Sequence, residues 1–372
     1  MARVVLAMSG GVDSSVAAHL LRAAGHEIVG VFMRHGEPLT AASCASEKPA
    51  ANSLLPIIGA RADHKQGCCT ASDAQDARRV ADQLDIPFYA VDFQQDFGRI
   101  IDYFIEEYTA ARTPNPCVMC NNWIKFGRLF DYADSVGAEF VATGHYAQLL
   151  PAGSNEMALC RGLDETKDQS YVLFGIESRL LSRMMLPIGG YRKSEIRRLA
   201  HELDLRVADK RDSQEICFVP GGDHAEFIRS KRGDSASAGE VVTSDGRVVG
   251  THDGLERFTI GQRKGLGIAL GEPRFVIRLE SDTNRVVLGT KDELARRELS
   301  AGSTNWLVDP PHAGQPCQAK IRYNSPPVAA TVTALPDDRL AVVFDETQYG
   351  VAPGQAVVCY DGSRVLGGGW IE

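Results

Sequence analysis

The sequence predicts an α/β protein with one domain built on a parallel sheet, followed by two small β-rich modules. Two observations support this prediction. Up to about residue 225, short runs of β-branched and aromatic residues alternate with stretches of helical spacing, which is typical of a parallel sheet covered on both faces. Beyond that point, short strand-like runs separated by Asp-Gly turns replace the helical stretches.

Length and composition set the scale of the molecule. The chain has 372 residues, more than a single hydrophobic core usually serves, so two or three domains are expected. Hydrophobic residues make up 44% and charged residues 24%, as in an ordinary globular protein. No window is apolar over the length of a membrane span, and the first residues lack a signal-peptide pattern. We therefore expect a cytoplasmic protein without membrane contact.

The charge balance restricts the kind of nucleic-acid partner. The 40 Lys and Arg against 48 Asp and Glu give a net charge of −8, which argues against a non-specific nucleic-acid binder. Local basic surfaces remain open, and the candidates are residues 192–198, residues 229–232, and Lys320 with Arg322. Each of these alone is more often a solvated helix face or loop.

The first domain is expected to span residues 1–225. Its predicted strands lie at 4–8, 28–33, 88–93 and 140–143, and its predicted helices at 14–24, 73–84 and 98–111. Ligands of such sheets bind beyond the carboxyl ends of the strands. Residues 35–66 are rich in Ala, Ser, Pro and Lys without a sustained period, which indicates a surface insertion.

Two β-rich modules are expected after residue 225, and both are predicted to be antiparallel. Residues 226–292 form a small central domain with strand-like runs at 240–242, 247–249, 275–279 and 286–288. Residues 293–372 form a C-terminal, barrel-like domain with runs at 318–321, 329–333, 340–344 and 356–360.

The most specific local pattern is the glycine loop, residues 9–15, with the sequence Ser-Gly-Gly-Val-Asp-Ser-Ser between the first strand and the first helix. Two glycines allow a tight turn whose N–H groups approach an anion, and the helix N-terminus adds donors and a favourable dipole. The loop lacks the Gly-Lys-Ser/Thr ending of a Walker A motif. The alternative is a turn that only caps a helix, but the position at the first strand-to-helix junction favours a phosphate site. We expect Asp13 to act through Mg²⁺, because a bare carboxylate repels phosphate.

The nine cysteines do not form a disulfide scaffold in a reducing compartment. Cys117 and Cys120 follow two prolines, and their spacing places both sulfurs on one side of a turn or helix start. A thiol at a helix N-terminus or beside Arg has a lowered pKa. Zinc would need four ligands, and no second Cys-x-x-Cys is present. Cys217, directly before Phe218, would by itself more often belong to a core.

Seven segments taken in order resemble the tRNA-specific 2-thiouridylase family. The glycine loop resembles the pyrophosphate loop of N-type ATP pyrophosphatases, which cleave ATP between the α and β phosphates. The others are Thr-Pro-Asn-Pro with Cys-Asn at 113–121, Gly-His-Tyr at 144–146, Lys-Asp-Gln-Ser-Tyr at 167–171, Asp-Ser-Gln-Glu-Ile-Cys-Phe at 212–218, Phe-Thr-Ile-Gly-Gln-Arg-Lys-Gly-Leu-Gly at 258–267 and Ile-Arg-Tyr at 321–323. The resemblance covers essentially the whole chain apart from residues 35–66.

The resemblance implies a fold and a reaction. The fold is an adenine nucleotide α-hydrolase-like ATP pyrophosphatase domain, then a small β-rich central domain and a C-terminal β-barrel. The reaction is ATP-dependent 2-thiolation of the wobble uridine of tRNA, in which the 2-oxygen is adenylated and a cysteine persulfide supplies the sulfur. AMP and pyrophosphate are released. The implied cofactors are ATP and Mg²⁺, and the implied partners are tRNA and a sulfur-relay or cysteine desulfurase protein.

The resemblance also assigns residues, position by position. Cys217 matches the cysteine that carries the persulfide, and Cys120 matches the thiol that attacks it or closes a disulfide with Cys217. The positions that match ATP contacts are Ala7, Met8, Ser9, Gly10, Gly11, Val12, Asp13, Ser14, Met33 and Gly144. The positions that match tRNA contacts are Asn115, Pro116, Cys117, His145, Lys167, Asp168, Gln169, Arg322, Tyr323 and Gln355, of which residues 115–117 meet the target base.

Cys117 departs from the family pattern, which more often has Asp at this position. Together with Cys120 and Cys217 it could supply three thiolates to an iron–sulfur cluster with one open iron. The persulfide route needs only two of these thiols and is favoured here, with no metal ligand assigned.

Two other functions fit parts of the sequence. An enzyme that adenylates a small carbonyl for amide formation explains the glycine loop but gives the three cysteines no role. A nucleotide-gated RNA-binding protein without turnover explains the β modules, yet it also leaves the thiols unused. ATP–pyrophosphate exchange or AMP release, with and without tRNA, discriminates among the three.

Overall fold

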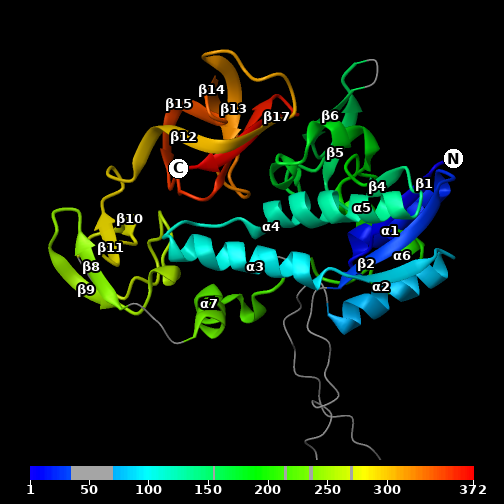
Figure 1. The fold of residues 1–372 in the computed structure, drawn as a ribbon, viewed down its shortest axis with the longest axis horizontal. Helices are drawn as coiled ribbons and strands as arrows, with labels where there is room; N and C mark the ends of the chain where they lie inside the picture. The colour runs from blue at the N-terminus through cyan, green and yellow to red at the C-terminus, as the bar shows by residue number, and fades with distance from the viewer. Residues whose placement is uncertain (35–69, 154–155, 213–215, 234–237, 269–270) are drawn as a thin grey trace, which may run out of the picture.

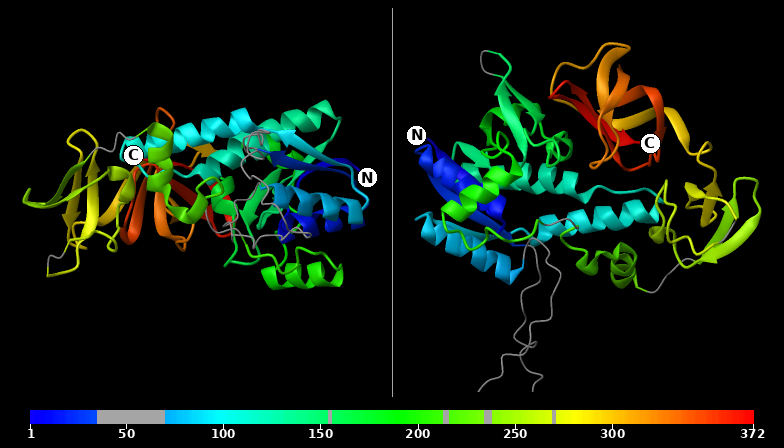
Figure 2. Two further views of the ribbon diagram at one scale, coloured as in Figure 1. Left: turned by 90° about the horizontal axis from the view of Figure 1, so that it is seen from below. Right: turned by 180° about the vertical axis from the view of Figure 1, so that it is seen from behind.

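The computed structural model describes residues 1–34, 70–153, 156–212, 216–233, 238–268 and 271–372. The chain forms a sheet domain, a small middle domain and a barrel (Figure 1). The two views of Figure 2 place the N-terminal sheet and the middle domain at opposite ends of the molecule. The predicted insertion at residues 35–66 lies outside the described residues, as do Cys44, Cys68 and Cys69.

The sheet domain contains five parallel strands, which confirms the predicted fold class. Val4, Val5 and Leu6 of the central strand are fully buried because both faces of the sheet are covered. The strand order is β3 (Phe88–Asp92), β2 (Glu27–Arg34), β1 (Arg3–Ala7), β4 (Phe140–Ala142) and β7 (Met184–Met185). Four of these strands agree with the predicted ones to within one or two residues, and β7 is additional.

Helices cover both faces of this sheet because successive β1 side chains point in opposite directions. Leu6 belongs to a core with α1 (Val12–Ala23), α2 (Ala71–Gln83) and α6 (Lys193–Glu202). Val5 belongs to the opposite core, with α3 (Gln94–Thr109), α5 (Leu129–Ser135) and the 3₁₀ turns η3 (Ser170–Leu173) and η4 (Ser178–Arg183).

The two cysteines of the Cys-x-x-Cys pattern lie at the start of a long helical rod. Helix α4 (Pro116–Met119) continues into the π-helical segment η2 (Cys120–Arg128) and then into α5. Phe126 has non-helical dihedral angles (φ −120°, ψ 17°) and marks a kink in this rod. In Figure 1 the rod lies alongside α3, and the two helical stretches contact each other.

The middle domain departs from the prediction in one respect. Its sheet has the order β10 (Phe275–Glu280), β11 (Arg285–Gly289), β8 (Gly239–Thr243) and β9 (Val248–His252). Strands β8 and β11 are parallel, so the expectation of a purely antiparallel module is wrong. The chain between β9 and β10, which includes η6 (Leu255–Arg257), carries β11 to the far side of β8 in the same direction.

The predicted C-terminal β-barrel is confirmed. Strand β12 pairs with both β15 and β17 and so closes the ring. The strand order is β12 (Ala295–Trp306), β15 (Arg339–Tyr349), β14 (Val328–Leu335), β13 (Gln315–Lys320), β16 (Ala356–Asp361) and β17 (Arg364–Ile371).

Three connections join the barrel and middle domain to the sheet domain. The hairpin β5 (Ala147–Pro151) and β6 (Met157–Arg161) extends the barrel sheet through a pairing of Cys160 with Arg364. Ala111, two residues after the end of α3, packs against the core of the middle domain. Turn η5 (Pro220–Gly222) leads into α7 (His224–Arg232), which crosses the boundary expected at residue 225 and contacts η6.

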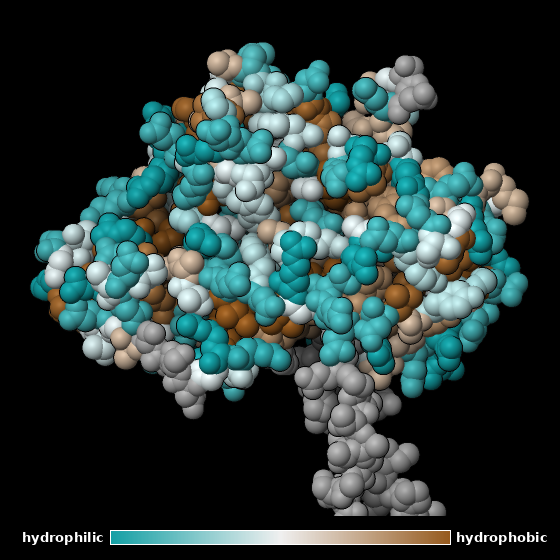
Figure 3. Space-filling model, viewed as in Figure 1, coloured by the Kyte–Doolittle hydropathy of each residue, from teal (hydrophilic) through white to brown (hydrophobic). Residues whose placement is uncertain are grey.

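The face of the molecule seen in Figure 3 carries no broad apolar patch. Hydrophobic residues appear there in small separate groups among hydrophilic ones. Among the described residues, no helix has the length and apolar character needed to cross a membrane.

Candidate nucleotide and thiol site

The glycine loop has a conformation that requires glycine. Gly10 has φ +72°, and a Cβ at this position would lie 2.2 Å from the carbonyl oxygen of Asp73. The hydroxyls of Ser14 and Ser15 both donate to the carbonyl of Gly11, at 3.2 and 2.8 Å. The sequence therefore folds the loop tightly over the N-terminus of α1, the geometry of an anion site.

The other predicted ATP positions lie at neighbouring strand ends. Ala7 is the last residue of β1, and Met33 is the next-to-last residue of β2. Gly144 lies two residues after the end of β4. A Cβ on Gly144 would lie 2.8 Å from the backbone nitrogen of Ser14, so the loop after β4 packs against the start of α1. Three adjacent strands thus bring these positions together at the carboxyl edge of the sheet.

Asp13 faces a buried lysine. Lys193 Nζ lies 2.8 Å from both carboxylate oxygens of Asp13 and 2.9 Å from Asp212 Oδ1. The hydroxyl of Tyr146 also donates to Asp13, at 2.7 Å, and burial together with the Asp13 charge raises the pKa of Tyr146. Lys193 is only 8% exposed, so its assignment to a solvated basic surface is wrong. Residues far apart in sequence compensate its charge.

The segment that leads to Cys217 is tied to the glycine loop at a second place. Lys210 Nζ donates to the carbonyl of Gly10 at 2.9 Å and bonds the carboxylates of Asp73 and Asp76 at 2.6 and 2.9 Å. The same segment is therefore held by lysines at both the loop backbone and the Asp13 carboxylate.

Asp212 is a junction of three cations. It accepts from Lys167 at 2.8 Å, from Lys193 at 2.9 Å and from Arg197 at 2.9 Å. Burial alone would raise the pKa of Asp212, but the hydrogen bonds and charges of Lys167 and Lys193 outweigh it and hold the pKa at about 2. Asp212 therefore stays ionised at neutral pH.

The structure places both predicted catalytic cysteines against the same apolar core. Cys120 and Cys217 are partly buried and pack against the cluster that contains Phe97 and Val118. Phe218, next to Cys217, meets Phe97 edge to face with ring centroids 5.5 Å apart. The two thiols thus border the same core from separate parts of the chain.

Cys117 lies in the first turn of α4 and is exposed. Asn115 caps this helix by accepting from the Val118 N–H at 3.3 Å, and Pro116 occupies the first helical position. Among the described residues, no group of three or more His, Cys, Asp or Glu side chains has the arrangement of a metal site. Cys117, Cys120 and Cys217 are therefore not arranged as ligands of an iron–sulfur cluster in this conformation.

The barrel holds the loop that precedes the cysteines. Gln355 Nε2 donates to the carbonyls of Thr113 and Pro114, both at 3.0 Å, and Pro353 accepts from the Thr113 N–H at 2.8 Å. A Cβ on Gly354 would lie 3.0 Å from the Thr113 nitrogen. Gln355 was predicted to contact tRNA, but in this structure its side chain binds the loop that precedes the cysteines.

Three other predicted tRNA contacts are engaged within the protein. His145 is buried, with Nδ1 2.7 Å from the Thr143 hydroxyl, and burial lowers its pKa well below the ordinary value. Asp168 accepts from the Ser170 N–H and hydroxyl, both at 3.0 Å. Gln169 accepts from the Tyr146 N–H at 2.9 Å. Asp168 and Gln169 thus hold backbone N–H groups, whereas His145 contacts a side-chain hydroxyl.

The last group of predicted tRNA residues lies where the barrel meets α4. Arg322 donates to the carbonyls of Ile260 and Gly350 at 3.1 and 2.6 Å, which joins the middle domain to the barrel. Tyr323 is 38% exposed and lies near enough to Cys117 that the thiol's charge raises its pKa, after burial and Asp168. Lys320 was expected on a solvated surface, but it is buried.

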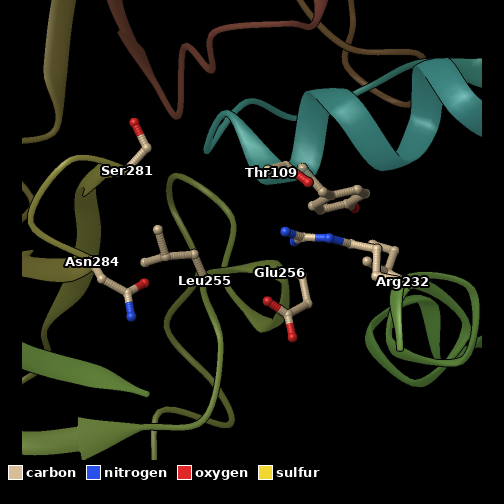
Figure 4. Close-up of a pocket in the computed structure, with 8 residues that line it drawn as sticks. Thr109, Arg232, Leu255, Glu256, Ser281 and Asn284 are labelled. Atoms are coloured by element: carbon tan, nitrogen blue, oxygen red, sulfur yellow. The ribbon is translucent and has the colours of Figure 1, made fainter. Parts of the chain in front are cut away.

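A separate cavity of about 190 Å³ lies between the sheet and middle domains (Figure 4). Thr109 at the end of α3, Arg232 on α7 and Glu256 on η6 contribute to its wall. None of the residues predicted for ATP, tRNA or catalysis lines it.

Comparison with known protein families agrees with this architecture. Residues 2–221 match the family model described as tRNA methyl transferase HUP domain. Residues 225–290 match a tRNA methyl transferase PRC-barrel domain, and residues 296–371 match an aminomethyltransferase beta-barrel domain. The fold and the glycine loop thus define a three-domain protein of the HUP class.

Curated relatives specify the family. A tRNA-specific 2-thiouridylase MnmA from Rhodopirellula baltica is 58% identical, over 100% of this chain and 96% of the relative. Proteins of the same name from Geotalea uraniireducens and Carboxydothermus hydrogenoformans are 45% and 44% identical, over 100% of this chain and 95% and 97% of their own lengths. The chain belongs to the tRNA-specific 2-thiouridylase family.

Proposed function

We propose that the protein is a cytoplasmic enzyme that uses ATP to convert the wobble uridine of tRNA to 2-thiouridine. The observation that carries this proposal is the pair of lysine contacts from the glycine loop to the Cys217 segment. Lys210 binds the Gly10 carbonyl, and Lys193 bridges Asp13 and Asp212. These contacts support the proposal because they tie the loop proposed to bind phosphate to the segment proposed to carry sulfur, as adenylation coupled to sulfur transfer requires.

The first step is adenylation of the uridine. The 2-oxygen attacks the α-phosphorus of ATP, and pyrophosphate leaves toward the N–H groups of the glycine loop. Mg²⁺ suits this site because its usual ligands are phosphate oxygens and one or two carboxylates, and Asp13 is the carboxylate of the loop. When bound, the ion neutralises the phosphates. Lys193, which is paired with Asp13 in this structure, would also interact with the negative charge of the bound nucleotide.

The second step is sulfur transfer. The terminal sulfur of a Cys217 persulfide attacks C2 of the uracil, and AMP leaves with the original oxygen. The Cys120 thiolate then attacks the Cys217 sulfur, which breaks the sulfur–sulfur bond, leaves one sulfur on C2 and closes a Cys120–Cys217 disulfide. The sulfane sulfur is reduced and the two thiols are oxidised, so a cellular thiol reductant must reopen the disulfide.

Two macromolecular partners follow from this chemistry. The substrate is tRNA, whose target base must leave the anticodon stack to reach the thiols. The persulfide comes from a sulfur-relay protein or a cysteine desulfurase. The amide-forming alternative remains weaker, because it gives Cys120 and Cys217 no role.

The test is formation of 2-thiouridine by the purified protein. Wobble-uridine tRNA is incubated with ATP, Mg²⁺ and a persulfide donor under anaerobic conditions, and the digested nucleosides are identified by mass spectrometry. We expect 2-thiouridine with wild type and none with Cys217→Ser or Cys120→Ser. No thiolated nucleoside with wild type, or a methylated one in its place, overturns the proposal.

Cys117 separates the two sulfur routes in the same assay. Cys117→Asp introduces the commoner family residue, and because the persulfide route needs only Cys120 and Cys217, we expect it to retain activity within about tenfold. Iron and sulfide are measured on the same samples. An inactive Cys117→Asp protein that has also lost bound iron would replace the persulfide route by a cluster route.

A further inference from the structure

Lys320, the last residue of β13, is a buried lysine that faces aromatic rings. It is 7% exposed, and its Nζ lies 5.8 Å from the ring centroid of Tyr171 and 5.7 Å from that of Tyr323. Across the described part of the chain, no hydrogen bond or ion pair reaches this Nζ. The side chain is mostly buried, and an ammonium with so little compensation there is less favourable than in water, which favours a neutral amine or a bound ligand at this place.

The surroundings of Lys320 belong to the predicted base site. The rings of Tyr171 and Tyr323 meet edge to face with centroids 6.3 Å apart. The Asn115 side chain lowers the pKa of Tyr171, and the charge of Cys117 raises that of Tyr323, so both rings lie near the cysteine-bearing loop. Asn115 and Cys117 flank Pro116 in the segment that matches target-base contacts. Lys320 therefore stands beside the groups that would hold the uracil.

The electrostatics of this place favour a proton acceptor. Burial lowers the pKa of Lys320, the charge of Asp168 opposes this, and that of Arg161 adds to it. Burial raises the pKa of both Tyr171 and Tyr323, so neither phenol is a base at neutral pH. Among the charged groups that act on Lys320, only Asp168 is an anion, and it is already bonded to Ser170 and the Gly162 N–H.

The chemistry of adenylation needs such a group. When the 2-oxygen of uridine bonds to phosphorus, a C2=N3 double bond forms, and the N3–H bond must give up its proton. When sulfur later replaces the AMP oxygen as a thione, N3 regains a proton. One amine can therefore serve both steps, first as base and then as acid, and end the cycle unchanged.

We propose that Lys320 accepts the N3 proton of the target uridine during adenylation and returns it during sulfur transfer. The electron pair of the N3–H bond becomes the second bond of C2=N3, the π pair of the C2=O group shifts onto the 2-oxygen, and that oxygen, still bonded to C2, bonds to the α-phosphorus as pyrophosphate leaves. The proton stays on Lys320 Nζ until the C2=S group and N3–H form together. This inference rests on the function proposed above and adds a catalytic residue to it.

Lys320→Arg is the decisive variant, because arginine keeps the positive charge and the ring contacts but cannot act as a base near neutral pH. Single-turnover pyrophosphate release and 2-thiouridine formation are measured at saturating tRNA from pH 6 to 10. We expect the wild-type rate to rise with pH as a group deprotonates. In Lys320→Arg that rise disappears and the rate falls about 10²- to 10⁴-fold, while tRNA affinity is retained.

Lys291 provides a matched control. Its Nζ lies 4.5 Å from the ring centroid of Tyr349, yet it is exposed and outside the predicted site. Lys291→Arg should therefore behave as wild type. Lys320→Ala supplies a second measurement that does not depend on how arginine fits: added primary amines should restore its rate, the more basic amines more effectively.

The outcomes are separable. A Lys320→Arg protein with a normal rate and pH profile, a loss confined to tRNA affinity, or Lys320→Ala without amine rescue each overturns the assignment. A pH-dependent rise that survives in Lys320→Arg but is lost in Cys117→Ser assigns the proton to the thiol instead. Absence of 2-thiouridine with wild type overturns the proposed function itself, whereas active wild type with unaffected Lys320→Arg overturns this inference alone.

Discussion

Two pairs of basic side chains, one in the sheet domain and one at the barrel, have their charges compensated differently. In the sheet domain, Lys193 and Lys210 contact carboxylates at 2.6 to 2.9 Å. At the barrel, Arg322 contacts two backbone carbonyls and Lys320 contacts two rings. Over the ranges that the structure describes, neither barrel cation forms an ion pair with a carboxylate.

The difference distinguishes cations that stabilise the structure from cations that are available to bind a ligand. A cation with carboxylate partners is compensated before any ligand arrives, so Lys193 and Lys210 fix the glycine loop against the Cys217 segment. Burial lowers the pKa of both Lys320 and Arg322, which shows that their charges are only partly offset. A phosphate or a base edge completes such groups. We therefore expect mutations on the sheet side to disturb geometry. On the barrel side, we expect a change at Arg322 to weaken tRNA binding and a change at Lys320 to slow the reaction.

The largest effect is expected at Asp13. Asp13→Ala removes the carboxylate of the glycine loop and leaves Lys193 with Asp212 alone. We expect tRNA-dependent AMP formation to fall about 10²- to 10³-fold, because a charged group aimed at the phosphates is lost. The measurement is AMP release from labelled ATP, with circular dichroism to verify the fold.

Glu202 on α6 is the matched control for Asp13. Its carboxylate pairs with Arg198 at 2.6 Å on an exposed helix face. It lies on the same helix as Lys193, but at the opposite end of that helix. Glu202→Ala should leave AMP formation unchanged. Normal AMP release by a folded Asp13→Ala protein would show that the loop does not use this carboxylate.

A smaller effect is expected at Asp212, and it depends on pH. Its pKa is lowered from 3.8 to about 2 in the folded protein, so it contributes stability above pH 4 that is lost as the pH falls through about 2. Because this side chain is partly exposed, we expect about 1 kcal/mol in the free energy of unfolding at pH 7. Urea unfolding of Asp212→Asn from pH 7 to 2 should show a weaker acid dependence than wild type.

Asp131 serves as the comparison for that measurement. It pairs with Arg128 at 3.0 Å but is largely exposed, so Asp131→Asn should unfold like wild type at every pH. If Asp212→Asn and Asp131→Asn show the same pH dependence of the free energy of unfolding, the ion pairs of Asp212 contribute no more stability than an exposed surface ion pair.

Much of the sheet domain was predictable from sequence because its signals are local. The strand and helix patterns and the glycine loop each depend on neighbouring residues. Strand β17 was missed because Gly367, Gly368 and Gly369 disfavour a strand prediction. A Cβ on Gly368 would lie 2.2 Å from the Val357 carbonyl oxygen, so glycine is required by close approach to β16.

The burial of Lys193 and Lys320 could not be predicted for the opposite reason. Lys193 meets Asp13 across 180 positions of sequence, and Lys320 meets Tyr171 only after the barrel docks on the sheet domain. A lysine in sequence is typical of a surface, and only tertiary contacts reverse that expectation. The motif positions that match the family did identify the segments on which these partners lie.

The smallest effect is expected at Arg322, and it tests the barrel side of the comparison. Arg322→Gln keeps an amide that can donate to the carbonyls of Ile260 and Gly350 but removes a permanent charge. If this charge meets a tRNA phosphate, the slope of log affinity against log salt should become shallower by about 0.7 to 0.9. Filter binding of tRNA over a range of salt concentrations measures this slope.

Arg198→Gln is the comparison on the sheet side. Arg198 is exposed but already paired with Glu202, so its loss should leave the salt slope as in wild type. Equal slopes for all three proteins would mean that tRNA docks elsewhere and that Arg322 serves only to join the domains. A change with Arg198→Gln alone would reverse the comparison, because the carboxylate-paired cations would then be the ones that meet the phosphate backbone.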